Sequence, residues 1–321
     1  MKIREIYDLA VQMGMEADPR GIEKVKALLE KEKKKHGEMK EEDRKESDTE
    51  TLTNPYSDTR ILTGDPDKEV KRVLVGIDME VGEVLLADRI TEKGTPIDLI
   101  ISHHPEGKAL AALHGVMHMQ EDILAQAGVP INVAEGILSA RIGEVKRTVM
   151  PLNHNRAVDA ARILGHALMC VHTPADNLVT AALQKKIDEQ KPETVGDVIK
   201  LLKGEPEYTE AAKSGAGPTI IVGSKERRAG KIMVDMTGGT SGSDDAYGKL
   251  SQAGVGTLVV MHIGEKHRKE AEKNHINVIN AGHMASDSMG MNLMLDRLEA
   301  AGVEVMPCAG LIRHKRAGIR N

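Results

Sequence analysis

Histidine is the residue type that offers this sequence the most chemistry, because the chain has 13 histidines and several stand close to carboxylates. Two of them, His103 and His104, directly follow the apolar run Asp98–Ser102, which we expect to form a strand. Open α/β sheets bind their ligands beyond the carboxyl ends of the strands, so site residues are expected here. Adjacent residues of an extended chain project to opposite sides, and the pair can therefore reach two metal ions that flank the strand end. A pair of ordinary loop histidines is the alternative.

A second motif places Asp176 four residues after His172, behind the apolar run Leu168–Val171. The two side chains share one face if a helix begins at Pro174. The alternative is that Asp176 begins or caps that helix and does nothing more.

A third motif repeats this spacing, with His283 and Asp287 placed after the predicted strand Ile276–Ile279. Like the first two motifs, it lies where a strand is expected to end. The alternative is that Ser286 or Asp287 only caps the helix that follows.

Together the three motifs offer nitrogen and oxygen ligands but no thiolate. Such a set suits Zn, Fe, Mn, Co or Ni, and it contains too much nitrogen for a dedicated Ca or Mg site. Carboxylates can bridge two ions, and two ions roughly 3.5–4 Å apart can polarise a substrate oxygen and activate water near neutral pH. His172 is then expected to support the ligands or to act as the catalytic acid or base. The expected ligands of two divalent transition metal ions are His103, His104, Asp176, His283 and Asp287.

The elements that must position these motifs are indicated by an alternation of short β-rich runs and amphipathic helical segments, which starts at Val70. This alternation predicts an α/β fold with largely buried strands. The predicted strands are Val73–Ile77, Asp98–Ser102, Ile131–Val133, Leu168–His172, Thr219–Val222, Ile232–Asp235, Thr257–His262, Ile276–Ile279 and Val303–Met306. The predicted helices include Gly107–Ala127, Arg156–Leu164, Asp244–Ala253, Glu265–Asn274 and Ser288–Ala301.

The chain is expected to divide into three regions. Residues 1–69 form an N-terminal helical extension and a linker, because helical spacing gives way to the turn-rich segment Asn54–Lys68. Residues 70–187 form a first α/β lobe with the metal motifs, and residues 283–321 join it. Residues 188–282 form a second α/β lobe, which follows a break around Asp188–Gly217 that is rich in Lys, Glu, Pro and Gly.

The composition argues against several other classes of protein. Single-stranded nucleic acid is bound on aromatic platforms, but the chain has no Phe, no Trp and four Tyr, and its net charge of -5 gives no basic footprint. A membrane span needs roughly 20 apolar residues in a row, which the sequence lacks. Two cysteines make no disulfide framework, and the first residues lack the apolar segment of a signal peptide. We therefore expect a reduced, cytoplasmic environment.

Three further segments have open roles. The Gly-rich segment Thr237–Asp244 either presents backbone N–H groups to an anion such as phosphate or is a plain tight connection. His262 and Glu265 follow another predicted strand and either line the same cavity or mark the start of a helix. The basic residues between Arg313 and Arg320 are expected to form a solvated end, with contact to an acidic substrate or a neighbouring subunit as the alternative.

The motifs, taken in order, resemble those of the Nif-three-like family. They are the strand VLVGID near Asp78, the run DLIISHHP, the HTxxD pattern, and GHxxS followed by an acidic residue. Members of this family are also known as GTP cyclohydrolase 1 type 2 homologues. The resemblance covers roughly Val70 to Cys308. It implies a two-lobed α/β fold with mixed sheets flanked by helices, here with an N-terminal helical extension.

The resemblance also implies that the five ligands named above hold a dinuclear metal centre. It further implies ring-shaped hexamers whose metal sites face the interior. The chain departs from the family pattern at Asp287, where the family usually has Glu, so a shorter side chain must bridge the metals. The stretch between His104 and His172 is longer than usual, and the helical residues 1–50 lie outside the common core of the family.

The function expected from these observations is that of a dinuclear-metal hydrolase acting on a small polar substrate, with nucleotides among the candidates. The narrower expectation of GTP cyclohydrolase activity comes from the family alone. The alternative is a non-catalytic metal-binding or regulatory scaffold protein that forms a ring. The expected partners are a small-molecule substrate and further copies of the chain, and neither a membrane nor nucleic acid.

Overall fold

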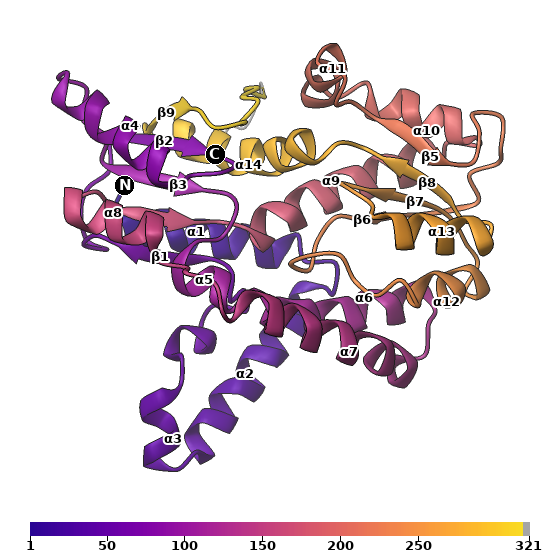
Figure 1. Ribbon diagram of the computed structural model, residues 1–321, viewed down its shortest axis with the longest axis horizontal. Helices are drawn as coiled ribbons and strands as arrows, with labels where there is room; N and C mark the ends of the chain where they lie inside the picture. Colours follow the sequence, from indigo (N-terminus) through magenta and orange to yellow (C-terminus); the bar gives the residue numbers. More distant parts are fainter. Residues whose placement is uncertain (317–321) are drawn as a thin grey trace.

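The strands of the chain form two separate sheets, which Figure 1 shows at the left and right of the molecule. The computed structural model describes residues 1–316. The first sheet has the order β1-β4-β3-β2-β9, and the second has the order β5-β8-β7-β6. In each sheet one edge strand, β1 or β5, runs antiparallel to its neighbour and the other strands are parallel. The expected α/β fold with two mixed sheets flanked by helices is confirmed.

The strands are short and their bounds agree closely with most of the predicted ones. The first sheet consists of β1 (Arg60–Thr63), β2 (Arg72–Gly76), β3 (Leu99–Ser102), β4 (Leu168–Cys170) and β9 (Glu304–Pro307). The second consists of β5 (Thr219–Val222), β6 (Lys231–Asp235), β7 (Val255–Val260) and β8 (Asn277–Asn280).

Helices cover both faces of the first sheet because successive strand residues point to opposite sides. In β2, Val73 and Val75 pack against one face, covered by α1 (Ile3–Glu16) and α14 (His283–Ala300). Leu74 packs on the other face, covered by α4 (Val81–Glu92) and α8 (Arg156–Leu164).

The second sheet is covered in the same way. One face carries α6 (Met119–Ala127), α7 (Ile131–Val149), α12 (Ala246–Gln252) and α13 (Glu265–Lys273). The other face carries α9 (Thr173–Gln190), α10 (Val195–Leu202) and α11 (Pro206–Lys213).

Helices α9 and α14 pack against both sheets. Ala175 of α9 and Met294 of α14 belong to the core of the first sheet. Val179 of α9 and Met289 of α14 belong to the core of the second. The two helices also pack against each other, so their N-terminal ends lie side by side in the middle of the molecule.

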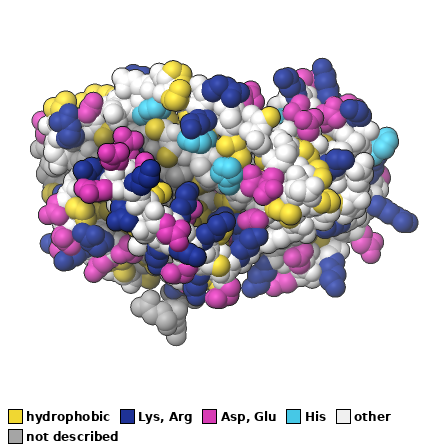
Figure 2. All heavy atoms as spheres, turned by 90° about the horizontal axis from the view of Figure 1, so that it is seen from below, with side chains coloured by type: hydrophobic (Ala, Val, Ile, Leu, Met, Phe, Trp, Pro, Cys, Tyr) yellow, Lys and Arg dark blue, Asp and Glu magenta, His cyan; other side chains and the backbone are white. Residues whose placement is uncertain are grey.

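The N-terminal region is only partly an extension. Helix α1 is part of the first core, and Ile3, Ile6 and Ala10 are completely buried. Helices α2 (Ile22–Glu38) and α3 (Glu41–Glu46) project from the body, as Figure 1 shows, and the short helix η1 (Thr49–Leu52) leads back to it. Figure 2, which views the molecule from the side of this projection, shows Lys and Arg interspersed with Asp and Glu, as expected for a solvated surface.

Two predicted segments are wrong because apolar runs and turn residues are ambiguous over short lengths. The expected linker Asn54–Lys68 contains strand β1, whose turn-forming neighbours mark the ends of the strand. The expected strand Ile131–Val133 is the first turn of α7, since its apolar residues continue at helical spacing through Leu138 and Ile142.

Two longer segments also differ from their predicted form. The expected helix Gly107–Ala127 is divided into α5 (Gly107–Ala111), the 3₁₀ helix η2 (Leu113–His118) and α6. Residues 119–149, which the sequence places in the first lobe, form α6 and α7 and pack on the second sheet. Whether the two sheets behave as separate lobes with the predicted boundaries stays a prediction.

The C-terminal segment is not the solvated end that its charge suggested. Arg313 pairs with Asp296 of α14 at 2.6 Å, and Arg316 pairs with the fully buried Glu207 of α11 at 2.8 Å. Asp296 lies 17 positions from Arg313 and Glu207 lies 109 positions from Arg316, so the local charge pattern of the C-terminal segment did not reveal either partner. Arg320 lies outside the described residues. None of the helices in the described part of the chain has both the length and the apolar character that crossing a membrane requires.

Candidate metal centre

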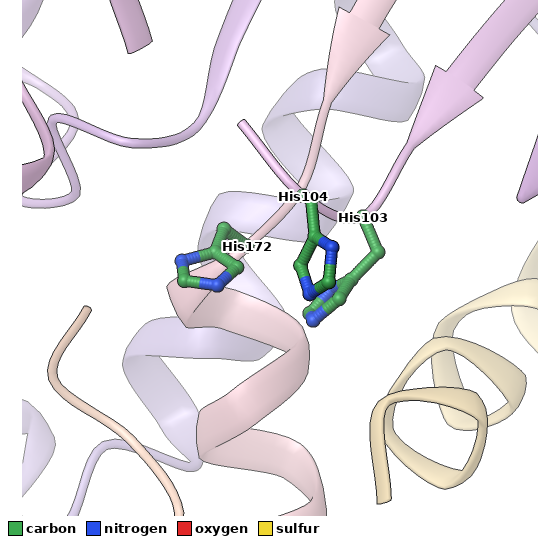
Figure 3. A group of neighbouring side chains, drawn as sticks. All are labelled: His103, His104 and His172. Atoms are coloured by element: carbon green, nitrogen blue, oxygen red, sulfur yellow. The ribbon is translucent and has the colours of Figure 1, made fainter. Parts of the chain in front are cut away.

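His103 and His104 lie where the chain leaves β3. The backbone continues the parallel pairing for two residues beyond the strand, since the N–H of His103 donates to the carbonyl of Gly76 at 3.0 Å and that of His104 donates to Ile77 at 2.9 Å. These two bonds fix both residues, which lie in a bend, at the carboxyl edge of the sheet. Figure 3 shows both rings turned toward the space beside His172, which precedes α9.

The other two motifs lie at the starts of α9 and α14. His172 is the N-cap residue of α9, and Asp176 lies in the first turn of that helix. Gly282, with a φ of 108°, leads into α14, which begins at His283. Because the N-terminal end of a helix carries a partial positive charge, both starts favour a nearby carboxylate. Asp176, Ser286 and Asp287 are not the N-cap residues of their helices, so the expected caps are wrong, although Asp176 does lie in the first turn of α9.

Asp287 is the side chain around which the site converges. Its Oδ1 lies 3.6 Å from Nε2 of His103, and its Oδ2 lies 3.5 Å from Nε2 of His104 and 3.4 Å from Nε2 of His283. Asp176 Oδ1 lies 3.5 Å from the same Nε2 of His103. The five expected ligands therefore form two groups of three that share Asp287.

These atoms lack hydrogen-bond partners although they are buried. His103 Nε2, Asp176 Oδ1 and both oxygens of Asp287 have none in the described part of the chain. Separations of 3.4–3.6 Å are too long for good hydrogen bonds. They match the spacing of about 3.4 Å between two ligands that bind one tetrahedral ion at about 2.1 Å. The donor set therefore fits metal ions, and the site can bind metal.

The histidines are oriented by bonds at their other ring nitrogen. Nδ1 of His103 lies 3.0 Å from the carbonyl oxygen of Val171, and Nδ1 of His104 lies 2.6 Å from Oδ1 of Asp78. A proton on Nδ1 that is donated to these acceptors leaves Nε2 free to bind a cation. The arrangement thus selects the form of each ring that metal binding needs.

The electrostatics of the site also favour a cation. Burial lowers the pKa of His283 to about 4, so its ring is neutral. Burial by itself raises the pKa of the Asp287 carboxyl, but the neighbouring histidines His103, His104 and His283 together outweigh burial and hold this pKa well below its usual range. Burial raises the pKa of Asp176 well above its usual range, and the carboxylates of Asp287 and Asp58 add to this effect. The protein crowds carboxylates together here, and bound cations would relieve their repulsion.

His172 differs from the other histidines in its partner. Its Nδ1 lies 2.8 Å from Oδ2 of Asp58, a fully buried carboxylate that also accepts a hydrogen bond from the hydroxyl of Thr173. Burial lowers the pKa of His172, but the charges of Asp176 and Asp58 outweigh burial and raise it to about 9. Nε2 of His172 lies 3.8 Å from Oδ2 of Asp176, and the three histidines of Figure 3 are close enough for His172 itself to join a metal site.

The structure thus brings all six predicted site residues together, while their separate roles as ligands or catalyst stay predictions. His262 also lines the cavity beside the site, whereas Glu265 is not in its lining and pairs with Arg268 and Lys269 at the start of α13. Asp58 and Asp78 were missed as partners of the histidines. Asp58 lies in the turn-rich segment and Asp78 in a strand motif, and no spacing in the sequence links either of them to a histidine.

The Gly-rich segment Thr237–Asp244 forms a wall of the same cavity. The side-chain amide of Gln120 donates to the carbonyls of Gly238 and Thr240, each at 2.7 Å. Gly238 and Gly239 have φ values of 97° and 86°, which favour glycine. These contacts describe a tight connection held by α6, and whether it binds an anion stays open.

No family model matches the sequence, and no curated protein matches it. Among solved structures, the chain is similar to a NIF3 superfamily protein from Sphaerobacter thermophilus, with a TM-score of 0.70 and 27% identity over 79% of this chain and 92% of that chain. It also has the fold of the reduced form of HcgD from Methanocaldococcus jannaschii, with a TM-score of 0.50 and 14% identity over 77% and 87% of the two chains. The chain thus has the fold of a NIF3 superfamily protein, and its three histidine motifs converge at Asp287.

Proposed function

We propose that the protein is a metal-dependent hydrolase with two divalent transition metal ions, acting on a small polar substrate. The observation that carries this proposal is the position of Asp287, whose two buried oxygens face different histidines and have no partner in the described part of the chain. One group of donors is His103, Asp176 and Asp287, and the other is His104, His283 and Asp287. A carboxylate shared in this way is suited to bridge two ions.

In the proposed hydrolysis, the metal ligands and His172 have different roles. Two bound ions would polarise a substrate oxygen and lower the pKa of water near neutral pH. His172 would move the proton, because Asp58 holds its Nδ1 and directs its Nε2 toward the donors. The donor set of nitrogen and oxygen suits Zn, Fe, Mn, Co or Ni. The free cysteines Cys170 and Cys308 agree with a reducing, cytoplasmic setting.

The metal content of the purified chain tests this proposal. Protein prepared without chelator is expected to contain close to two transition metal ions per chain, and the double variant His103→Ala, His283→Ala is expected to contain less than one. Because metal binds the folded state, adding metal should also raise the melting temperature of the native chain and not that of the variant. His118→Ala, which removes an exposed histidine outside the site, is the matched control. Metal content unchanged by the double variant would contradict the proposal.

The narrower activity of a GTP cyclohydrolase is a separate proposal that rests on the family resemblance. Metal-loaded protein is incubated with GTP, and the nucleotide is followed by chromatography and by the ultraviolet spectrum of its purine ring. Opening of the ring supports the activity. If GTP stays unchanged through a long incubation, the proposal of GTP cyclohydrolase activity is wrong, and the proposal of a metal site is not affected.

The second candidate function is a non-catalytic metal-binding scaffold that assembles into a ring, for which the family resemblance suggests a hexamer. The observation that favours assembly is a set of exposed apolar side chains on the neighbouring helices α4 and α8: Leu85, Leu86, Ile163 and Leu164. Apolar residues grouped on a surface are typical of contacts between chains. A scaffold is favoured if the double variant named above loses assembly and stability together. A hydrolase is favoured if it stays assembled and loses only turnover.

A further inference from the structure

A cavity of about 110 Å³ adjoins the metal centre and extends beneath the second sheet. At one place it is lined by His283 and Asp287, and elsewhere by the end of β6, by α12 and by α6. Its walls are largely apolar, with Leu124 and Leu258 among them. The cavity therefore connects the proposed reaction site to a region that the metal ligands do not occupy.

Asp235 is the one carboxylate in this cavity that lies outside the metal centre. It ends β6, and its side chain lies on the same side of the strand as Met233, toward α6 and α12, because strand residues alternate. No hydrogen bond or ion pair among the described residues reaches the Asp235 carboxylate. The neighbouring group whose charge lowers its pKa is His267. Burial raises the pKa of Asp235 to about 6, although the side chain remains accessible to water through the cavity. Asp235 is exposed at the cavity and has no partner among the described residues, so its carboxylate is free to accept charged hydrogen bonds from a cation bound there.

The wall beside Asp235 is suited to a flat ring. Of the four tyrosines in the chain, Tyr247 alone lines this cavity. Its pKa is raised by burial and then by the charge of Asp235, which lies close to it. The ring of Tyr247 is oriented edge-on to His267, with their centroids 5.8 Å apart. At about 110 Å³ the cavity is smaller than the roughly 150 Å³ that holds one benzene molecule, so it admits at most a single ring and no larger polycyclic group.

We propose that this cavity is the recognition subsite for a compact ring that carries an amidinium-like cation, with the cation bound by Asp235 and the ring against Tyr247. A planar N–H pair matches the two oxygens of a carboxylate, and the hydrogen bonds are strengthened by charge. Substituents on the other side of the ring extend toward Asp287 and His283. This last statement rests on the proposed metal-dependent function, whereas binding of the cation by Asp235 does not.

The subsite is tested with three probes of nearly equal size: benzamidine, which is cationic, benzamide, which is neutral, and benzoate, which is anionic. Isothermal titration of the full chain is expected to give a dissociation constant for benzamidine at least about tenfold lower than for benzamide, with benzoate weakest. Asp235→Asn, which keeps the size of the side chain, should remove the difference between benzamidine and benzamide. Asp244→Asn, in the adjoining loop but outside the cavity lining, is the matched control and should keep it.

Each titration is made on chelator-treated and on metal-loaded protein, so that the two proposals fail separately. If metal binds but benzamidine shows no preference over benzamide, the subsite is wrong and the metal centre stands. If the preference depends on Asp235 but no metal binds, the subsite stands and the metal centre is wrong. A preference that survives Asp235→Asn would assign the cation to the carboxylates of the metal centre, and that result overturns the subsite. If Asp235→Asn fails to fold, the metal-loaded protein decides, because metal occupies the carboxylates of the metal centre. A benzamidine preference that persists in metal-loaded protein supports Asp235, and a preference that metal abolishes overturns the subsite.

Discussion

At the scale of single residues, the centre depends on carboxylates that face more than one histidine. Asp287 is completely buried, and its oxygens have histidine nitrogens on two sides but no hydrogen-bond partner in the described residues. A buried charge of this kind is costly unless a partner neutralises it. Asp287 lies near the start of α14, and from there its carboxylate faces His103 and His104, which follow β3.

We expect Asp287→Asn to lower the metal content from close to two ions per chain to less than one. The amide keeps the shape of the side chain but removes the charge that two cations would share. The measurement is elemental analysis, with circular dichroism to verify the fold. Asp296→Asn is the matched control, because Asp296 lies on the same helix and pairs with Arg313 instead. Equal metal content in the two variants would contradict a bridging role.

We expect Asp58→Ala to lower the free energy of unfolding by about 2 kcal/mol, because it leaves the Nδ1 of His172 and the hydroxyl of Thr173 buried without an acceptor. Urea denaturation of chelator-treated protein measures this loss apart from any effect of metal. Asp88→Ala is the control. Asp88 also pairs with a histidine, His166, but it is partly exposed, and a change of less than about 1 kcal/mol is expected. Similar losses in both variants would mean that Asp58 has no special role.

At the scale of elements, the site depends on how closely α14 crosses α9. A Cβ atom at Gly290 of α14 would overlap the carbonyl oxygen of Ala175, the residue before Asp176. On its other side α9 meets α1, where a Cβ at Gly14 would lie 2.6 Å from Cβ of Pro174. Glycine therefore lets three helices approach, and this approach brings the first turns of α9 and α14 to the same point.

We expect Gly290→Ala to destabilise the protein by about 1–3 kcal/mol and to reduce metal binding, because α14 must shift away from α9. Helix propensity alone predicts the opposite, a gain of about 1 kcal/mol. Gly136→Ala in α7 is the control, since a Cβ there meets nothing within 4 Å and the gain should be realised. Urea denaturation and metal analysis of both variants test the argument. If Gly290→Ala were as stabilising as Gly136→Ala, the crossing would not be tight.

At the scale of the whole molecule, the two sheets are joined through α9 and α14, and the centre lies at their meeting point. The ends of β3 and β4 contribute from the first sheet, and the cavity of Asp235 extends under the second. A substrate bound in both places would touch both halves of the molecule. The outer face of the first sheet, covered by α4 and α8, carries the four exposed apolar residues named above.

We expect the double variant Leu86→Asp, Ile163→Asp to shift the protein from an oligomer toward the chain mass of 34.8 kDa, because charge on this apolar face opposes contact between chains. Sedimentation velocity at several concentrations measures the mass. Lys34→Asp, on the projecting α2, is the control and should leave the oligomer intact. A native chain that is already monomeric, or a double variant with unchanged mass, would show that this face is not an interface.

Much of the fold could be predicted because helices and buried strands have different periods. Most predicted strands lie within two residues of the observed ones, and α8 begins and ends at the predicted residues. The failures fall where a short segment carries no clear period. Ile131–Val133 is three residues long, and β1 is hidden among turn residues. Arg313 and Arg316 find their partners on α14 and α11, and no local pattern records such a distance.

For the candidate site, the sequence by itself determined which side chains lie near the strand ends: His103, His104, His172 and His283, with Asp176 and Asp287 each four residues after its histidine. The tertiary structure decided which of them meet. Asp58 reaches His172 across 114 positions of sequence, and Asp235 enters the same cavity from the other sheet. The reason is physical: periodicity along a chain reflects which face of an element is buried, whereas the neighbours of a buried carboxylate depend on how distant elements pack together.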